Sequence, residues 1–418
     1  MKFFKWFYPG MGIKRWILLC GAGITIIVLI SLYSIRIFSK TSILLASFIT
    51  AILIFGIFLI VTSIKNMLRT FVRALMPKDE SELVNIVYRK RMERFLERGP
   101  RVVVVGGGTG LSVLLQGIKK HTNNVTAIVT VTDTGGSSGR LRDEFDMLPP
   151  GDIRNCLVAL ADAEPLMGEL FQYRFENGSG LKGHSFGNLF ITALSKITGD
   201  FDRAIKESSK VLAIRGRVIP STLEKVSLIG EFEDGKIVEG ETNITAVKKP
   251  LRRLRLKPEN CRATKEAIEA LENADLIILG PGSLYTSILP NLLIKEIVGA
   301  INDSDAYKVY VSNIMTQPGE TDNLTSEGHL KALISHTNPN IVNVCIINNG
   351  VVPKRLLQKY EEQDSKIVSL DLNKIKMHGC DVVQGDIVKV DDMIRHDPEK
   401  LAKLIFDKFL EHGIKDEA

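Results

Sequence analysis

The sequence predicts an α/β protein in which a mostly parallel sheet carries helices on both faces, preceded by an N-terminal membrane segment. From Arg101 onward, short β-branched or aliphatic runs alternate with helical patterns, which is typical of parallel sheets covered by helices. Segments rich in glycine, serine and threonine follow several of these runs. The region before Arg101 instead holds two long stretches without a charged residue.

The two uncharged stretches are long enough to cross a bilayer as helices. Residues 17–35 give 19 such positions and residues 41–64 give 24, which suits a hydrocarbon layer of about 30 Å. Only the segment "RIFSK" separates them, so we expect a transmembrane helical hairpin within residues 1–78, in contact with the lipid bilayer. The alternative for the first stretch is a cleaved signal peptide, because Lys14 and Arg15 resemble the charged start of one. The second uncharged stretch follows immediately, which favours two membrane helices.

Charge is distributed unevenly along the chain. Residues 1–100 contain 15 Lys and Arg against 5 Asp and Glu, whereas the remaining residues contain 39 against 43. Basic residues flank the two stretches on their outer sides, so the positive-inside rule predicts a multi-pass membrane protein with its N-terminus and large C-terminal domain in the cytoplasm. We expect residues 79–99 to form a charged helical linker. The large domain has no overall excess of positive charge, and nucleic acid is therefore not an expected partner.

Hydrophobic periodicity predicts the elements of the large domain, residues 100–410. The expected strands are residues 102–105, 125–132, 276–279, 308–311 and 341–347. The clearest helical patterns are residues 111–121, 186–196, 263–272 and 292–302. The pair Asp234–Gly235 lies between short alternating runs and predicts a hairpin. We therefore expect a β insertion at about residues 214–260 and a C-terminal tail at residues 411–418.

Polar, glycine-rich loops follow the expected strands. They read "GGGTGLS" after Val105, "DTGGSSGRLR" from Asp133, "GPGSLYTS" after Leu279 and "SNIMTQPGETDN" after Val311. Glycine allows close backbone approach, and the start of a following helix offers free N–H groups to an anion. Ligands of such sheets bind beyond the carboxyl ends of the strands, so the loops predict a phosphate-bearing ligand.

The first loop does not match the dinucleotide-binding fingerprint. The pattern GxGxxG started at Gly106 meets Leu111 where the third glycine is required, and started at Gly108 it meets Val113. Asp133 stands where an NAD enzyme places its ribose carboxylate, but a second glycine- and serine-rich loop follows it. An NAD(P)-dependent oxidoreductase is therefore the least favoured of three functional hypotheses.

A series of motifs resembles the gluconeogenesis factor family, which is related in fold to 2-phospho-L-lactate transferase. The motifs are "GGGTGLSVLL", "VTVTDTGGSSGRLR", "PPGDIRNCLVALA", "GHSFGNL", "GPGSLYTSI" and "MTQPGETD", within residues 100–410. The resemblance implies a Rossmann-like domain that binds UDP-sugars, notably UDP-N-acetylglucosamine. It also implies a role in cell shape and peptidoglycan precursor supply during gluconeogenic growth. The N-terminal membrane segment departs from the family's usual members, which we expect to lack it.

The candidate ligand contacts in the first two loops are of two kinds. Backbone N–H groups and one hydroxyl of the first loop would hold the ligand, at Gly107, Gly108, Thr109 and Gly110. Ser137, Ser138 and Arg140 would face the diphosphate or the sugar, because the guanidinium fork of arginine suits phosphate oxygens.

Two carboxylates are the candidate metal ligands, and each has a structural alternative. Asp133 and Asp152 could hold Mg²⁺ or a ribose, but either could instead cap a helix or a loop. His184 and Asn188 precede and begin a helix at the expected ligand edge, so they are candidate contacts too. A structural histidine is the alternative for His184.

The remaining candidates lie further along the chain. In "GPGSLYTS" they are Ser283, Leu284 and Tyr285, of which Tyr285 could stack on a base or be a partly buried aromatic residue. Asn313, Thr316 and Gln317 offer hydrogen bonds to a uracil edge. Tyr360 and Arg395 are ligand contacts by the family resemblance alone, and their sequence patterns would otherwise suit surface residues.

Three functional hypotheses follow from these residues and the resemblance. The first is a membrane-tethered UDP-sugar-binding regulator, without catalytic residues, that acts on a protein partner in wall-precursor metabolism. The second is a Mg²⁺-dependent transferase acting on a nucleotide diphosphate, with the metal at Asp133 and Asp152. The third is the NAD(P)-dependent oxidoreductase. Spacing places no Ser-His-Asp or Cys-His arrangement in the loops, and the sequence leaves a homo-oligomer open.

Overall fold

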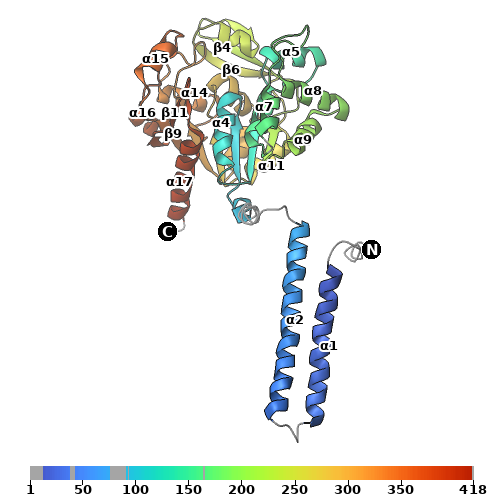
Figure 1. Ribbon diagram of the computed structural model, residues 1–418. Coiled ribbons are helices and arrows are strands. Elements are labelled where there is room, and N and C mark those ends of the chain that lie inside the picture. Colours follow the sequence, from blue (N-terminus) through green and yellow to red (C-terminus); the bar gives the residue numbers. More distant parts are fainter. Residues whose placement is uncertain (1–12, 38–42, 76–90, 93, 163–164, 417–418) are drawn as a thin grey trace. The chain divides into compact units, whose positions relative to one another are not determined.

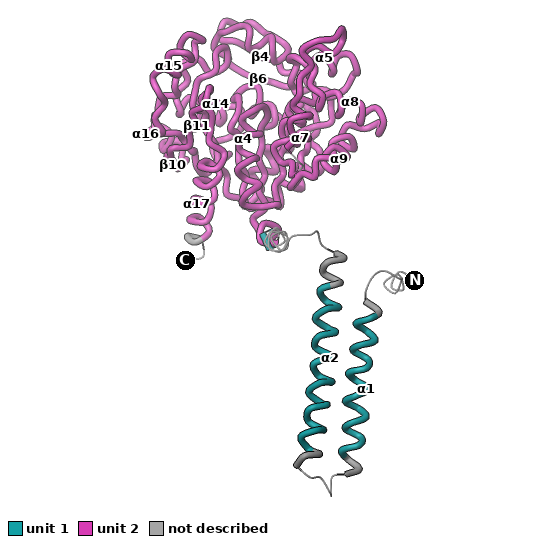
Figure 2. The backbone as a smooth tube through the Cα atoms, in the orientation of Figure 1, with its two compact units in different colours: residues 1–92 teal, residues 93–418 magenta. Residues whose placement is uncertain are grey.

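The computed structural model divides the chain into two compact units, residues 1–92 and residues 93–418 (Figure 2). The residues that it describes are 13–37, 43–75, 91–92, 94–162 and 165–416. Most of the expected linker at residues 79–99 lies outside the described residues, as do residues 1–12 and 38–42 of the expected membrane segment.

The first unit contains two long apolar helices that lie side by side (Figure 1). They are α1 (Ile13–Ile37) and α2 (Ile43–Leu75). The backbones approach closely at two glycines, since a Cβ atom on Gly23 would lie 3.0 Å from the Gly56 carbonyl oxygen. Such small residues allow tight helix packing in membranes. The segments Arg15–Ser34 and Ala46–Arg69 are long and apolar enough to cross a membrane, as the sequence predicts.

The second unit is built on a seven-stranded sheet with the order β10-β9-β8-β7-β1-β2-β3. Each pair of neighbouring strands is parallel. The strands are β1 (Val102–Gly106), β2 (Val125–Val129), β3 (Arg217–Pro220), β7 (Leu276–Leu279), β8 (Tyr307–Val311), β9 (Val344–Asn348) and β10 (Asp381–Gly385). This arrangement confirms the predicted parallel α/β fold.

The central strands are buried along their whole length, which explains their unbroken apolar sequences. Every residue of β1, β2, β7 and β9 is buried. From β1 the chain first adds β2 and β3 on one side, and later adds β7 and then β8, β9 and β10 on the other. The direction of strand addition therefore reverses between β1 and β7, and such a switch point opens a crevice beyond the carboxyl ends of the strands.

Helices cover the sheet and fill the connections between its strands (Figure 1). Those before β7 are α4 (Gly108–Ile118), α5 (Gly136–Phe145), α6 (Gly151–Leu160), α7 (Pro165–Gln172), α8 (Phe186–Thr198), α9 (Phe201–Val211) and α11 (Lys265–Glu272). Those after it are the π-helix η2 (Leu284–Ile288), α12 (Leu289–Leu292), α13 (Lys295–Asp303), α14 (Ser326–His336), α15 (Lys354–Glu361), α16 (Leu372–Met377) and α17 (Pro398–Asp416). Because α17 continues to Asp416, residues 411–416 extend this helix and form no separate tail.

A small antiparallel sheet interrupts the alternation, with the order β5-β4-β6. It contains β4 (Ser227–Phe232), β5 (Ile237–Glu239) and β6 (Leu251–Lys257), with the short helix α10 (Glu241–Ala246) before β6. The hairpin turn lies at Asp234–Gly235, as predicted. The insertion begins after Pro220 and not near residue 214, because β3 belongs to the main sheet. A second hairpin, β11 (Val388–Val390) and β12 (Ile394–His396), follows β10.

Candidate functional site

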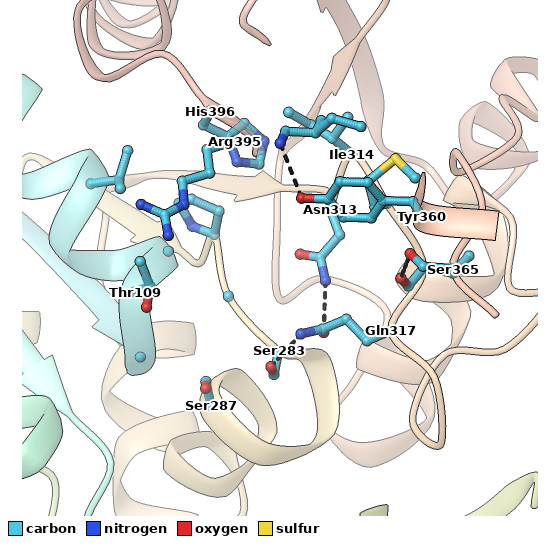
Figure 3. A pocket seen from close by; sticks show the side chains of 18 of the residues that line it. Thr109, Ser283, Ser287, Asn313, Ile314, Gln317, Tyr360, Ser365, Arg395 and His396 are labelled. Carbon is cyan, nitrogen blue, oxygen red and sulfur yellow. Dashed lines mark hydrogen bonds between the residues drawn. The ribbon is translucent and has the colours of Figure 1, made fainter. Parts of the chain in front are cut away.

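A cavity of about 450 Å³ lies beyond the carboxyl ends of β1, β7 and β8, at the switch point of the sheet (Figure 3). Residues from the loops that follow these strands line it, together with α15 and β12. Ten of the residues predicted from the sequence line this cavity: Gly107, Gly108, Thr109, Gly110, Ser283, Asn313, Thr316, Gln317, Tyr360 and Arg395. Sequence reasoning missed Ser287, Ser365 and His396, which also line it.

The first wall of the cavity is the N-terminus of α4. Its N-cap is Gly107, which has no side chain to cap the helix. The Asp152 carboxylate takes up the Gly108 N–H, and the following N–H groups of the first turn have no partner within the helix and are available to an anion. Gly108 has a φ of +65°, which favours glycine. A Cβ atom on Gly110 would lie 2.6 Å from the Pro281 carbonyl oxygen. The glycines therefore bring this helix end close to the neighbouring loop of β7.

A chain of side-chain hydrogen bonds forms the second wall. Gln317 donates from Nε2 to Ser283 Oγ at 2.6 Å, and Asn313 donates from Nδ2 to Gln317 Oε1 at 3.2 Å. These bonds fix the two amide groups, so the Asn313 carbonyl oxygen is the acceptor at the end of the chain. Thr316 instead has a structural role, because its Oγ1 accepts a hydrogen bond from the Lys366 backbone N–H.

Tyr360 of α15 and Arg395 of β12 form the third wall. The Tyr360 hydroxyl accepts a hydrogen bond from the Ile394 N–H at 3.0 Å, which ties α15 to the β11–β12 hairpin. The Arg395 side chain extends toward Thr109 at the start of α4 (Figure 3). Within the described residues, Arg395 forms no ion pair with a carboxylate. Its positive charge therefore faces the same region as the N-terminus of α4.

Three carboxylates gather beside the first loop. The Asp152 carboxylate accepts a hydrogen bond from the Gly108 N–H, and burial, with Asp133 nearby, raises its pKa to about 6. Asp133 accepts from the Gly135 N–H at 2.8 Å. Glu241 of α10 accepts from the Thr134 N–H at 3.1 Å, and burial and Asp133 raise its pKa to about 8. Glu241 was missed by sequence reasoning because no motif marks it in the β insertion.

The position of Asp152 favours the capping interpretation over the metal interpretation. It caps α4 through Gly108 and not its own helix α6, whose N-cap is Pro150. No group of three or more histidine, cysteine or acidic side chains has a metal-binding arrangement among the described residues. Mg²⁺ binding at Asp133 and Asp152 therefore remains a prediction.

Five further predicted residues form a polar cluster outside the cavity lining. Ser137 Oγ lies 3.0 Å from His184 Nδ1 and also accepts a hydrogen bond from Asn188 Nδ2 at 3.0 Å. Ser138 is buried next to them in α5, and Arg140 donates to the Lys182 carbonyl oxygen at 2.9 Å. The contact between Ser137 and His184 could not be predicted from motif spacing, because 47 residues separate the two in the sequence.

Leu284 and Tyr285 do not line the cavity, contrary to expectation. Their side chains are 0% and 7% exposed and belong to the main hydrophobic core. The Tyr285 ring packs edge-on against His336, with 6.1 Å between the ring centroids. The π-helical turn that contains them places Ser287 at the cavity instead. Tyr285 is thus the buried aromatic residue that the sequence left as an alternative.

Comparisons with known proteins agree with this fold. The family model "2-phospho-L-lactate transferase CofD" matches residues 102–388. The gluconeogenesis factor of Bacillus subtilis is 48% identical over 309 residues, covering 74% of this chain and 98% of that protein. A crystal structure of a protein from Bacillus halodurans has a TM-score of 0.72 at 48% identity, covering 74% of this chain and 100% of that one.

Another relative extends the similarity to the N-terminal unit. A protein from Clostridium acetobutylicum, provisionally named a gluconeogenesis factor, is 41% identical over 422 residues, covering 98% of this chain and 93% of that one. The expectation that relatives lack the first hundred residues therefore holds for only part of the family. The chain belongs to the CofD family and, within it, to the gluconeogenesis factors.

Proposed function

We propose that this protein is a membrane-tethered regulator that binds a UDP-sugar, notably UDP-N-acetylglucosamine, in the cavity at the switch point. The single observation that carries the proposal is the pairing of Arg395 with the glycine-rich N-terminus of α4, whose N-cap has no side chain, both on the cavity lining. A helix N-terminus and an arginine are two complementary ways of holding a diphosphate. The family resemblance of the sequence motifs implies the same class of ligand.

The other walls offer contacts for the two ends of such a ligand. The Asn313–Gln317–Ser283 chain presents fixed amide groups, which suit the donors and acceptors of a uracil edge. The half-buried ring of Tyr360 borders the cavity while its hydroxyl is held by Ile394, and an aromatic face can pack against a base or a sugar. A volume of about 450 Å³ falls within the usual range of ligand pockets.

The proposed biological role follows from the tether and the family. Residues 1–78 would hold the domain at the cytoplasmic face of the membrane, where lipid-linked wall precursors are assembled. The ligand-bound domain would then contact a protein partner in wall-precursor metabolism, and so support cell shape and peptidoglycan supply during gluconeogenic growth. Ligand-dependent contact with a partner requires only that the ligand favours one state of the domain.

Calorimetry on the full-length protein in detergent tests the proposal. UDP-N-acetylglucosamine, a guanosine diphosphate ester and NAD are titrated with and without Mg²⁺, and the recovered nucleotide is then identified by mass spectrometry. We expect UDP-N-acetylglucosamine to bind and to be recovered intact. Release of UMP would contradict a purely regulatory role, and failure of all three compounds to bind would contradict the phosphate-binding site itself.

A Mg²⁺-dependent transferase is the second candidate, and the three carboxylates favour it. Asp133, Asp152 and Glu241 repel one another when charged, and the raised pKa values of Asp152 and Glu241 express this repulsion and their burial. A cation would relieve the repulsion, as would a proton. Asp133 and Asp152 would hold Mg²⁺ only with ligand phosphates and water at the other positions. Nucleotide cleavage in Mg²⁺ that is lost in the Asp133→Asn variant, with ligand binding retained, would support this candidate.

A further inference from the structure

Three arginines converge on the turn formed by residues 182–185, which precedes α8. Arg140 of α5 donates to the Lys182 carbonyl oxygen, and Arg174 donates to the Gly183 carbonyl oxygen. Arg154 of α6 donates to Ser185 Oγ. The turn itself requires glycine, because Gly183 has a φ of +83° and a Cβ there would lie 3.0 Å from Arg140 Nη2. We call these residues the arginine turn.

The charges of these arginines are not balanced by ion pairs. None of the three forms an ion pair with a carboxylate in the part of the chain that the structure describes. Arg154 is only 9% exposed, it also donates to the Asn155 side-chain oxygen, and its Nε is buried without a hydrogen-bond partner. The carboxylates of Asp152 and Asp133 attract it without a direct ion pair, and the Arg174 charge opposes them. A buried cation that is only partly balanced in this way is costly. The turn therefore concentrates positive charge that a bound anion would stabilise.

The neighbouring hydrogen bonds hold the His184 ring beside these arginines. The Asn188 amide donates to Ser137 Oγ, and the same Oγ lies 3.0 Å from His184 Nδ1. Burial and the nearby Arg140 guanidinium lower the pKa of His184, which favours the neutral ring. In the tautomer in which Nδ1 accepts from Ser137, the ring proton is on Nε2. In this tautomer, on which the site proposed below depends, His184 adds an N–H group beside Arg140 and Arg174.

The N-terminus of α5 lies in the same cluster. Its N-cap is Gly135, which has no side chain and whose own N–H is bound by Asp133, and Ser137 stands in its first turn. The helix dipole adds partial positive charge there. Arg140 and Arg174 are exposed, so a ligand from solvent can reach them. None of these residues lines the cavity that we assign to the UDP-sugar.

We propose that the arginine turn, with Arg140, Arg174 and His184 as the contacts and Arg154 buried behind them, is a second binding site for the phosphate group of a small metabolite. Guanidinium forks and single N–H donors match the oxygens of a phosphate. The site goes beyond the nucleotide-sugar cavity and gives the domain a second ligand. A carboxylate-rich metabolite shares part of this chemistry, and the experiment below separates the two.

Titration of inorganic phosphate into the full-length protein in detergent tests the site. Ionic strength is held constant with chloride, and affinity is measured by calorimetry for the wild type and for the double variant Arg140→Gln/Arg174→Gln. We expect the double variant to bind phosphate about tenfold more weakly or worse, because it loses two charge-assisted contacts. The matched control is Arg203→Gln, an exposed arginine of α9, which we expect to bind as the wild type does.

Two further arms decide where the anion sits and what it is. Arg395→Ala removes the arginine of the cavity, which holds phosphate under the proposed function. A fall in phosphate affinity in Arg395→Ala without a fall in the double variant, or equal affinity in wild type and double variant, would overturn the proposal. Citrate is titrated in parallel, and binding of citrate in place of phosphate would also overturn it.

UDP-N-acetylglucosamine binding is measured separately on each variant, so failure of the cavity and failure of the arginine turn are distinguishable. If the double variant does not fold, Arg174→Gln alone provides the test, because Arg174 is exposed.

Discussion

Among single residues, Arg395 offers the most direct test of the cavity. Arg395→Ala removes the positive charge that faces the start of α4. We expect the affinity for UDP-N-acetylglucosamine to fall about 10- to 100-fold, the usual value of one charge-assisted hydrogen bond. Calorimetry measures the change, and Arg355→Ala, at an exposed position of α15, is the matched control. Equal affinities in the two variants would remove Arg395 from the site.

The raised pKa of Glu241 predicts how the free energy of unfolding of the protein depends on pH. Folded Glu241 keeps its proton up to about pH 8, whereas its ordinary pKa is 4.5. Between these values the folded state binds more protons than the unfolded state, so the contribution of Glu241 to the free energy of unfolding falls as pH rises. We expect Glu241→Gln to flatten this dependence, because glutamine cannot ionise. Thermal unfolding from about pH 5 to pH 8 measures it, with the exposed Glu233→Gln as control. Parallel profiles for wild type and Glu241→Gln would contradict the assignment.

The predictability of individual site residues depended on their distance from a strand end. Thr109 and Asn313 lie within three residues of the ends of β1 and β8, and the geometry of parallel sheets is enough to bring such residues together. Glu241 comes from the β insertion, whose docking beside Asp133 has no local sequence signal. The choice between the two roles left open for Tyr285 could not be made from the sequence, because a π-helical turn decides which side chains face the cavity and sequence periodicity does not reveal such a turn.

At the scale of elements, the contact between α4 and α17 is sensitive to a single methyl group. A Cβ atom on Gly117 of α4 would lie 1.9 Å from the Pro398 carbonyl oxygen, which is backbone and cannot move aside alone. We expect Gly117→Ala to destabilise the large unit by about 2 kcal/mol or more. Gly299→Ala in α13 meets no atom within 4 Å, and we expect it to stabilise by about 0.5–1 kcal/mol. Thermal unfolding followed by far-UV circular dichroism compares them, and a neutral Gly117→Ala would show that the helices separate easily.

Burial explains which elements the sequence predicted. The strands β1, β2, β7 and β9 are buried on both faces, so their apolar runs were recognisable. The two edge strands of the main sheet gave weaker signals. β3 has only four residues, and β10 is largely half-exposed, with a mixed sequence. The order in which the strands pair also could not be predicted from the sequence, because it depends on long-range packing.

At the scale of the whole molecule, both candidate membrane spans lie in the N-terminal unit. We therefore predict that this unit alone holds the protein at the membrane. The helices α1 and α2 are apolar and mostly exposed on their outer faces, a pattern that is stable in lipid and not in water. We expect full-length protein to stay in the membrane pellet after an alkaline carbonate wash, and residues 93–418 to be released. Retention of residues 93–418 in the pellet would show that the large unit binds membranes by itself.

The same pair of helices predicts on which side of the membrane the cavity lies. Two spans return the chain to the side on which it started, and the basic residues Arg15, Lys65 and Arg69 at the outer ends of the spans favour the cytoplasm. Protease added to intact spheroplasts is therefore expected to leave the large unit uncut, and cleavage is expected only after lysis. Cleavage in intact spheroplasts would place the cavity outside the cell, where a cytoplasmic nucleotide sugar could not reach it, and would contradict the proposed function together with the orientation.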